Sequence, residues 1–406
     1  MSRIVLGVSG GIAAYKACEV LRGLTEAGHE VTVVPTEAAL NFVGETTWSA
    51  LSGRPVHTGV FDDTHLVNHV RLGQQADLVL VVPATADLLA RAATGRADDL
   101  LTNVMLTSRA PVLLCPAMHT EMWQHPATRA NVAMLRSRGV AVLDPASGRL
   151  TGADSGPGRL PDPTEILAVA GTILDNPDVA SAMAAQDLAG RVVAVSAGGT
   201  REPLDPVRYL GNASSGRMGV AIARAAAARG ATVRLVAAHI EAEVPSGVEV
   251  TRVVTTEDLH GAMVTAAAGA DAVVMAVAAA DFTPETVSEG KIKKSGDEGL
   301  SLSLRQTTDV LKSLSAQRSR PGQVLAGFAA ETPGEQDLLA MARAKLARKG
   351  CDLIVVNDVT AGAVFGEADN TITLVEPTQV HGPYGGSKES LAHRIWDRIR
   401  QLLADA

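Results

Sequence analysis

Two glycine turns, one in each half of the chain, are placed where phosphate groups could bind. In the first, Ser9, Gly10 and Gly11 separate an apolar run from an alanine-rich stretch, the pattern of a strand that turns into a helix. Glycine allows the backbone to approach a ligand, and free N–H groups at a helix N-terminus attract anions. The second turn, at 196–200, could act in the same way, although it lacks the ending of a Walker A loop. An empty βα turn gives the same pattern.

Charged residues of the second half could bind a triphosphate and its Mg²⁺. Lys291 begins the run Lys-Ile-Lys-Lys about ten residues after Asp281, and Lys345 and Lys349 are four residues apart, on one face of a predicted helix. Lysines in such places are more often solvent-exposed charges. The segment 212–219, which begins with Asn212, has more hydrogen-bonding groups than the capping of a helix requires.

In the first half, polar residues follow predicted strands. The segments 83–87 and 116–123 both come after apolar runs, and open α/β sheets bind ligands at the carboxyl ends of their strands. The segment 116–123 includes His119 and could equally be an apolar loop that packs on the sheet. His69 precedes a predicted helix, where a histidine is most often a cap or a solvated side chain.

Short β-branched runs alternate with alanine- and leucine-rich stretches and predict parallel strands joined by crossover helices. The pattern ends with a predicted helix over 167–189 and then restarts, so we expect two α/β domains of the Rossmann type, 1–189 and 190–406. The predicted strands are 4–8, 31–35, 77–82, 112–115 and 140–143 in the first domain, and 191–196, 232–237, 250–254, 272–276, 324–328 and 353–356 in the second.

Composition narrows the class of protein. With 406 residues, 46% of them hydrophobic, the chain can form two or three domains with real cores. A net charge of −8 argues against a general nucleic-acid binder. The three cysteines are far apart and show neither a disulfide framework nor zinc-ligand spacing. With no signal peptide or apolar run long enough for a membrane span, we expect a cytoplasmic protein.

Several of these motifs occur together, and in the same order, in a known family. The turn at 9–11, Pro-Ala-Thr-Ala-Asp at 83–87 and Pro-Ala-Met-x-x-x-Met-Trp at 116–123 resemble the flavin-containing cysteine decarboxylases. Within these, the first half is similar to the phosphopantothenoylcysteine decarboxylase portion of the bifunctional coenzyme A biosynthesis enzymes. The second half resembles their phosphopantothenate–cysteine ligase portion at 196–208, 212–219, 278–281, 291–294, 327–332 and 357–359.

For the first half, the resemblance implies a flavodoxin-like domain that binds FMN. It implies that the flavin oxidises the substrate thiol to a thioaldehyde, which makes loss of carbon dioxide easy, and that an acid then supplies a proton. His69 is implied to be the active-site base. The residues implied to contact FMN are Ser9, Gly10, Gly11, Thr36, Thr85 and Thr107.

Two positions depart from the family pattern. Gly152 stands where the family has a proton-donating cysteine, and His119 stands where it has asparagine. The proton donor is then His119, Asp154 or a water molecule, and we include His119 among the predicted catalytic residues. The alternative is a ligase whose flavin-binding half is an oligomerisation scaffold with an impaired decarboxylase step. A non-catalytic flavoprotein subunit is disfavoured, because the ligase residues are intact.

For the second half, the resemblance implies a ligase domain with a mainly parallel sheet. It would use CTP and Mg²⁺ to join cysteine to 4′-phosphopantothenate through an acyl-cytidylate, although composition alone does not distinguish CTP from ATP. Lysines and Mg²⁺ would neutralise charge on the triphosphate. Asn212 and Lys291 are implied to be catalytic, and no metal ligands can be assigned. The residues implied to bind the nucleotide are Met275, Ala276, Val277, Asp281, Lys291, Thr308, Asp309, Val310, Leu311, Phe328, Lys345 and Lys349.

The resemblance also bears on assembly. It implies a homo-oligomer with trimeric flavin domains and dimeric ligase domains, and a dodecamer would satisfy both contacts.

Overall fold

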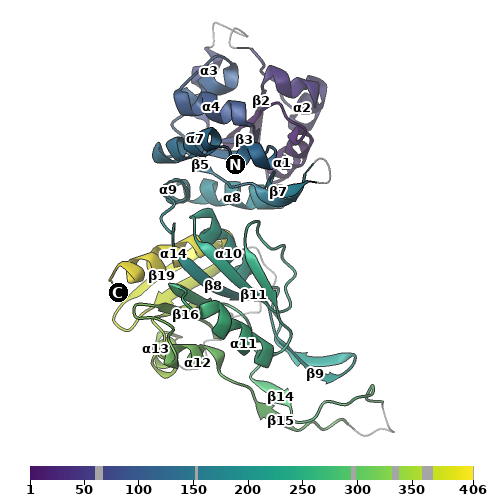
Figure 1. The fold of residues 1–406 in the computed structure, drawn as a ribbon, viewed down its shortest axis with the longest axis vertical. Helices are drawn as coiled ribbons and strands as arrows, with labels where there is room; N and C mark the ends of the chain where they lie inside the picture. Colours follow the sequence, from purple (N-terminus) through teal and green to yellow (C-terminus); the bar gives the residue numbers. More distant parts are fainter. Residues whose placement is uncertain (60–66, 151–153, 294–298, 332–337, 359–368, 406) are drawn as a thin grey trace. The chain divides into compact units, whose positions relative to one another are not determined.

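The computed structural model describes residues 1–59, 67–150, 154–293, 299–331, 338–358 and 369–405. By its internal contacts, the chain divides into two compact units, Met1–Asp187 and Leu188–Ala406 (Figure 1). The boundary placed from the sequence is at residue 189.

The first unit is built on a parallel sheet of five strands in the order β2-β1-β3-β4-β5, which is the doubly wound order of flavodoxin-like folds. Every residue of β3 is buried, as expected for a central strand that is covered on both faces. The strands are β1 (Arg3–Val8), β2 (Glu30–Pro35), β3 (Leu78–Ala84), β4 (Val112–Pro116) and β5 (Ala141–Val142), and a separate hairpin is formed by β6 (Ala146–Arg149) and β7 (Ser155–Arg159).

The helices of this unit start and stop where side chains satisfy their backbone ends. Thr85 caps α4, and Asp99 forms a capping box at the start of α5. The helices are α1 (Ala14–Glu26), α2 (Glu45–Ser52), α3 (Asn68–Gln75), α4 (Ala86–Thr94), α5 (Leu100–Thr107), α6 (Thr120–Gln124), α7 (Pro126–Ser137), α8 (Pro163–Asp175) and α9 (Asp178–Ala185), with a 3₁₀ turn, η1 (Glu37–Asn41).

The single helix predicted over 167–189 is wrong. The structure has two helices there, α8 and α9, separated at Asn176 and Pro177. Proline has no N–H to donate and disfavours the helical conformation of the residue before it. Asn176 accordingly has an extended backbone, with φ −146° and ψ 93°.

The second unit has an eight-stranded sheet in the order β12-β11-β8-β13-β16-β17-β18-β19. The first six strands are parallel, and the last two add to the edge in antiparallel fashion. The strands are β8 (Val192–Ala197), β11 (Thr232–Ala237), β12 (Glu249–Arg252), β13 (Ala272–Met275), β16 (Val324–Glu331), β17 (Leu353–Asp358), β18 (Asp369–Val375) and β19 (Val380–Ser387).

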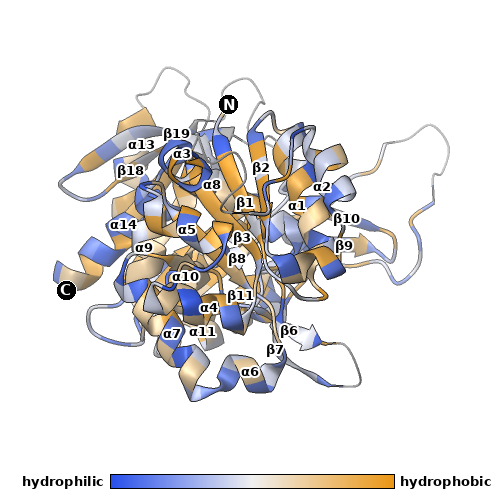
Figure 2. Cartoon of the chain, turned by 90° about the horizontal axis from the view of Figure 1, so that it is seen from above, coloured by the Kyte–Doolittle hydropathy of each residue, from blue (hydrophilic) through white to orange (hydrophobic). Residues whose placement is uncertain are grey.

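Helices cover both faces of this sheet. Residues of α10 (Arg217–Ala228) and α14 (Lys388–Asp405) pack in one buried apolar cluster, and those of α11 (Thr256–Ala267), α12 (Val310–Ala316) and α13 (Leu338–Lys349) pack in another. Two ribbons stand apart from the sheet, β9 (Arg201–Asp205) with β10 (Arg208–Gly211), and β14 (Phe282–Pro284) with β15 (Leu304–Gln306). Hydrophobic colour gathers on strands such as β1 and β3, whereas the helices carry both colours (Figure 2).

The α/β fold class predicted from the sequence is confirmed. None of the helices in the described ranges is both long enough and apolar enough to span a membrane.

Candidate functional sites

In the first unit, the predicted flavin residues other than Thr107, which ends α5, lie at one edge of the sheet. Ser9 follows β1, Thr36 follows β2 and Thr85 follows β3, and these three strands are neighbours. From β1 the chain continues to β2 on one side and reaches β3 on the other side, so the strand order reverses between β1 and β3. Open α/β sheets bind ligands in the crevice at such a reversal.

The hydroxyl groups of Ser9, Thr36 and Thr85 form hydrogen bonds to backbone groups of the protein itself. Ser9 is buried, and its Oγ donates to the carbonyl of Pro83 (2.7 Å) and accepts from the amide of Thr85 (2.9 Å). The hydroxyls of Thr36 and Thr85 accept from the amides at the start of η1 and α4. The hydrogen of Ser9 Oγ is therefore already donated, whereas the Thr36 and Thr85 hydroxyls act as acceptors in these bonds and keep a hydrogen to donate. The backbone N–H groups of the turn and of α1, whose N-cap residue Ala13 provides no side-chain cap, are the other donors for an anion.

The two glycines of the turn differ in what surrounds them. A Cβ added to Gly10 would lie 2.4 Å from Cβ of Ala38 and 2.8 Å from its carbonyl carbon, whereas at Gly11 the nearest atom would be Cγ2 of Thr85 at 3.5 Å. Gly10 is thus required by the close approach of η1, whereas a Cβ at Gly11 would make only an ordinary van der Waals contact.

Replacing Gly10 by alanine should destabilise the first unit by about 1–3 kcal/mol, because the Ala38 backbone must shift to admit the methyl group. Gly171→Ala, in α8, is the control: a Cβ there meets nothing within 4 Å and should be neutral or slightly stabilising. Thermal unfolding followed by tryptophan fluorescence reports on this unit, because Trp48 and Trp123 are two of the three tryptophans. Equal midpoints for Gly10→Ala and the unmodified chain would contradict the expectation.

His69 lies in the first turn of α3, where the neighbouring elements hold its backbone. The hydroxyl of Thr107, at the end of α5, donates to the carbonyl of His69 (2.8 Å). Val67, just before the helix, has φ +46°, which is rare for a β-branched residue and marks a constrained turn. Nδ1 of His69 is buried and has no hydrogen-bond partner within the ranges that the structure describes. A polar atom in this state is suited to a bound ligand.

The loop after β4 brings His119 close to Asp154. The imidazole Nδ1 is 3.5 Å from Asp154 Oδ2, and both side chains are about half exposed. The loop is held to β7 by the bond from the Met118 amide to the Gly158 carbonyl (2.9 Å). Gly152, at the position of the family's cysteine, lies outside the described residues. Cys115 is a poor substitute as a donor, because burial raises the pKa of its thiol.

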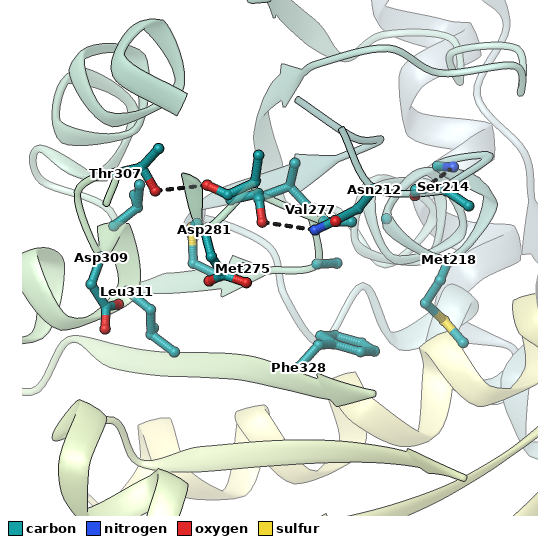
Figure 3. Close-up of a pocket in the computed structure, with 18 of the residues that line it drawn as sticks. Asn212, Ser214, Met218, Met275, Val277, Asp281, Thr307, Asp309, Leu311 and Phe328 are labelled. Atoms are coloured by element: carbon teal, nitrogen blue, oxygen red, sulfur yellow. Dashed lines mark hydrogen bonds between the residues drawn. The ribbon is translucent and has the colours of Figure 1, made fainter. Parts of the chain in front are cut away.

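In the second unit, the predicted nucleotide residues line one cavity of about 590 Å³ (Figure 3). The cavity adjoins the carboxyl ends of β13, β16 and β17, the edge at which parallel sheets bind ligands. Asn212 also lines it, with its Nδ2 donating to the carbonyl of Ala279 (3.0 Å). The predicted residues in the cavity wall are Met275, Ala276, Val277, Asp281, Thr308, Asp309, Val310, Leu311, Phe328, Lys345 and Lys349.

Two predicted nucleotide residues form an ion pair with each other. Nζ of Lys349 is 2.5 Å from Oδ2 of Asp309, and the other carboxylate oxygen caps α12 through the amide of Lys312. Burial acts to raise the pKa of the Asp309 carboxyl, but Lys349 and the Lys312 amide outweigh it, so that the pKa lies below its usual value. A triphosphate that engages Lys349 would compete with Asp309.

Lys291 is the predicted nucleotide residue that does not line this cavity. It lies in the segment of the chain that connects β14 to β15, and its side chain is exposed. The next residue, Ile292, is tied to the β9–β10 ribbon: its amide donates to Asp205 Oδ2 (3.1 Å), and its carbonyl accepts from Arg208 Nη1 (2.8 Å).

Sequence reasoning missed several residues around the cavity. Lys388, the first residue of α14, is nearly buried in its wall, and a lone lysine at a helix start gives no signal in one sequence. A second cavity of about 320 Å³ shares Asn212 to Ser215 with the first, and its other lining residues include Tyr209, His239 and Glu241. Within the described ranges, no group of three or more His, Cys, Asp or Glu side chains could hold a metal ion.

Comparisons with known proteins match both units. The flavoprotein family model matches residues 1–173, and the model of the DNA/pantothenate metabolism flavoprotein C-terminal domain matches residues 188–403. The coenzyme A biosynthesis bifunctional protein CoaBC of Mycolicibacterium smegmatis is 55% identical over 410 residues, 99% of this chain and 98% of that protein. The protein of the same name from Bacillus subtilis is 41% identical over 375 residues, 91% of this chain and 89% of that protein. A crystal structure of the C-terminal domain of a CoaBC protein is 31% identical, with a TM-score of 0.46, and covers 54% of this chain and 100% of that chain.

Proposed function

The chain belongs to the family of coenzyme A biosynthesis bifunctional proteins CoaBC, and we propose from the geometry of its two units how their residues divide the two reactions. It is an enzyme of coenzyme A biosynthesis with a flavoprotein decarboxylase domain and a ligase domain. This family membership favours the bifunctional hypothesis over a ligase with an impaired flavin half.

The ligase reaction is assigned to the large cavity of the second unit. We propose that CTP lies there, with Lys345 and Lys349 facing its phosphates, and that Asn212 holds the acyl-cytidylate formed from 4′-phosphopantothenate. The observation that carries this assignment is that one cavity collects Asn212 and every predicted nucleotide residue except Lys291. Asn212 lies where both cavities meet, as a group between the nucleotide and the acid should.

Decarboxylation of 4′-phosphopantothenoylcysteine to 4′-phosphopantetheine is assigned to the edge of the first sheet. FMN fits this edge, since backbone donors of the glycine turn face the strand reversal and the buried Nδ1 of His69 lacks a partner. When bound, FMN supplies the electron acceptor that oxidises the substrate thiol. We assign to His69 the role of the base that takes a proton from the substrate, and we propose that His119, with Asp154 beside it, returns one.

The binding of Mg²⁺ can be proposed from the same nucleotide chemistry. Mg²⁺ would be bound mainly by the phosphates of the nucleotide, with Asp281 as the candidate carboxylate, since Asp309, the other carboxylate in the cavity wall, pairs with Lys349. This is consistent with the lack of a cluster of metal-binding side chains in the described ranges.

We also propose a cytoplasmic homo-oligomer, in which trimeric flavin domains and dimeric ligase domains are compatible with a dodecamer.

The purified chain, loaded with FMN, tests both assignments. Given 4′-phosphopantothenate, Mg²⁺ and CTP, it should release pyrophosphate as the acyl-cytidylate forms, and it should release CMP only once cysteine is added. ATP should replace CTP poorly. Given 4′-phosphopantothenoylcysteine alone, it should release carbon dioxide. A colourless protein that takes up no FMN would reject the flavin assignment, and equal rates with ATP would reject CTP as the preferred nucleotide.

A further inference from the structure

A chain of buried hydrogen bonds leads from the carboxylate of Glu202 to Ala280, which lines the ligase cavity. The Glu202 side chain, in β9, belongs to a residue that is 3% exposed, and its Oε1 accepts from both the amide and the hydroxyl of Thr256, each at 2.8 Å. Thr256 begins α11, so the carboxylate faces the N-terminus of that helix. An acidic group there is stabilised by the helix dipole and by these two donors.

Two buried threonines continue the chain of hydrogen bonds from this carboxylate. Oγ1 of Thr256 is 3.1 Å from Oγ1 of Thr200, which in turn accepts from the amide of Ala280 (2.8 Å). A hydroxyl has a single hydrogen, and that of Thr256 goes to the carboxylate at 2.8 Å rather than to the Ala280 carbonyl at 3.3 Å. Thr200 must therefore donate to Thr256, which fixes the direction of every bond from the Ala280 amide to the carboxylate.

Ala280 is held from its other side as well. The hydroxyl of Thr307 donates to the Ala280 carbonyl (2.6 Å), the bond drawn at Thr307 in Figure 3. Both polar groups of the Ala280 backbone thus end on threonine hydroxyls. The Thr200 amide also donates to the carbonyl of Ala278 (3.2 Å), so that one residue, Thr200, pins the turn after β13 at two points.

This turn sets the orientation of Asn212. The carbonyl of Ala279, between the two pinned residues, accepts from Nδ2 of Asn212 (3.0 Å). A carbonyl can accept only from the NH₂ end of an asparagine side chain, so the bond determines which way the amide faces. Asp281, at the end of the same turn, lines the cavity.

We propose that Thr200 is a positioning residue of the ligase reaction, which acts through the Ala280 amide and the Ala279 carbonyl on the side chain of Asn212. The inference rests on the proposed role of Asn212 at the acyl intermediate. Thr200 is 1% exposed and does not line either cavity described above, so its effect on catalysis must pass through this turn.

Two substitutions separate the hydroxyl of Thr200 from its methyl group. Thr200→Val keeps the shape and removes the hydroxyl, and it should lower kcat of ligation about 10- to 100-fold with KM for CTP little changed. Thr200→Ser keeps the hydroxyl and should stay within about threefold of the unmodified chain. Thr172→Val removes another buried hydroxyl, in α8 of the first unit, and should leave ligation unchanged. If Thr200→Val does not fold, Thr307→Val releases the same turn from its other side and should show the same loss in kcat.

A double variant completes the test. In an Asn212→Ala background, Thr200→Val should add no further loss, because its effect passes through Asn212. A fully active Thr200→Val variant, an equal loss in Thr200→Ser, or losses that multiply in the double variant would each overturn the inference while leaving Asn212 in its role. A fully active Asn212→Ala variant would overturn that role, and the inference with it.

Discussion

Replacing His69 by asparagine is expected to abolish release of carbon dioxide from 4′-phosphopantothenoylcysteine, with a loss of roughly 10² to 10⁴-fold, while ligation continues at its normal rate. Asparagine is of similar size and can hydrogen-bond, but it cannot take up a proton near neutral pH. The backbone of residue 69 should keep its place, because Thr107 holds the carbonyl and not the imidazole. Carbon dioxide release and CMP formation, measured on the same preparation, give both rates.

A second histidine of the same unit provides the control for this experiment. His125 caps α7 by accepting from the Ala127 amide (3.2 Å), and asparagine is a good residue at a helix N-cap. His125→Asn should therefore leave decarboxylation unchanged. Retained flavin absorbance in His69→Asn would show that FMN is still bound. Decarboxylation at the normal rate in that variant would remove His69 from the reaction.

The parallel strands could be predicted from the sequence, whereas the antiparallel edge strand β19 could not. Buried parallel strands such as β3 are continuous apolar runs rich in valine, which local pattern reveals. β19 reads Val-His-Gly-Pro-Tyr-Gly-Gly-Ser, and its glycines and proline disfavour a strand in isolation. It forms because β18 offers an open edge with which to pair. The ribbons β9–β10 and β14–β15 depend in the same way on their partners.

In the candidate sites too, some features depend on neighbouring residues in the sequence and others on residues far away in it. Residues at the ends of parallel strands, such as Thr85 and Asp281, can be placed from the sequence because topology brings those ends together. The hydrogen-bond partners of their polar groups cannot be predicted from the sequence. Ser9 was predicted beside a phosphate, yet its hydroxyl joins two loops of the protein. Thr200 is part of a predicted phosphate turn, and the role that we propose for it depends on its hydrogen bond with Ala280, 80 residues away in the sequence.

Lys291 illustrates why charge alone is a weak guide to position. Its segment is fixed by the carboxylate of Asp205, which is buried and accepts from the amides of Val207, Arg208 and Ile292. Burial acts to raise the pKa of the Asp205 carboxyl, but these amide donors and the Arg208 guanidinium lower it below the usual value. The lysine is thus presented on an ordered backbone with its side chain exposed, a state that does not distinguish a solvated charge from a catalytic one.

Substitution makes that distinction. Lys291→Gln keeps a polar side chain, shorter by one atom, and removes its charge, and it should lower CTP-dependent ligation about 10²- to 10³-fold if the ammonium stabilises charge that develops on the triphosphate. The loss should be mainly in kcat, because an interaction made in the transition state affects kcat more than KM. Lys293→Gln removes an equal charge two residues away, also exposed, and should stay within about threefold of the unmodified chain, since only a directed charge acts on the transition state. Equal losses in the two variants would mean that the charge of the whole segment matters, and full activity in Lys291→Gln would reject its assignment.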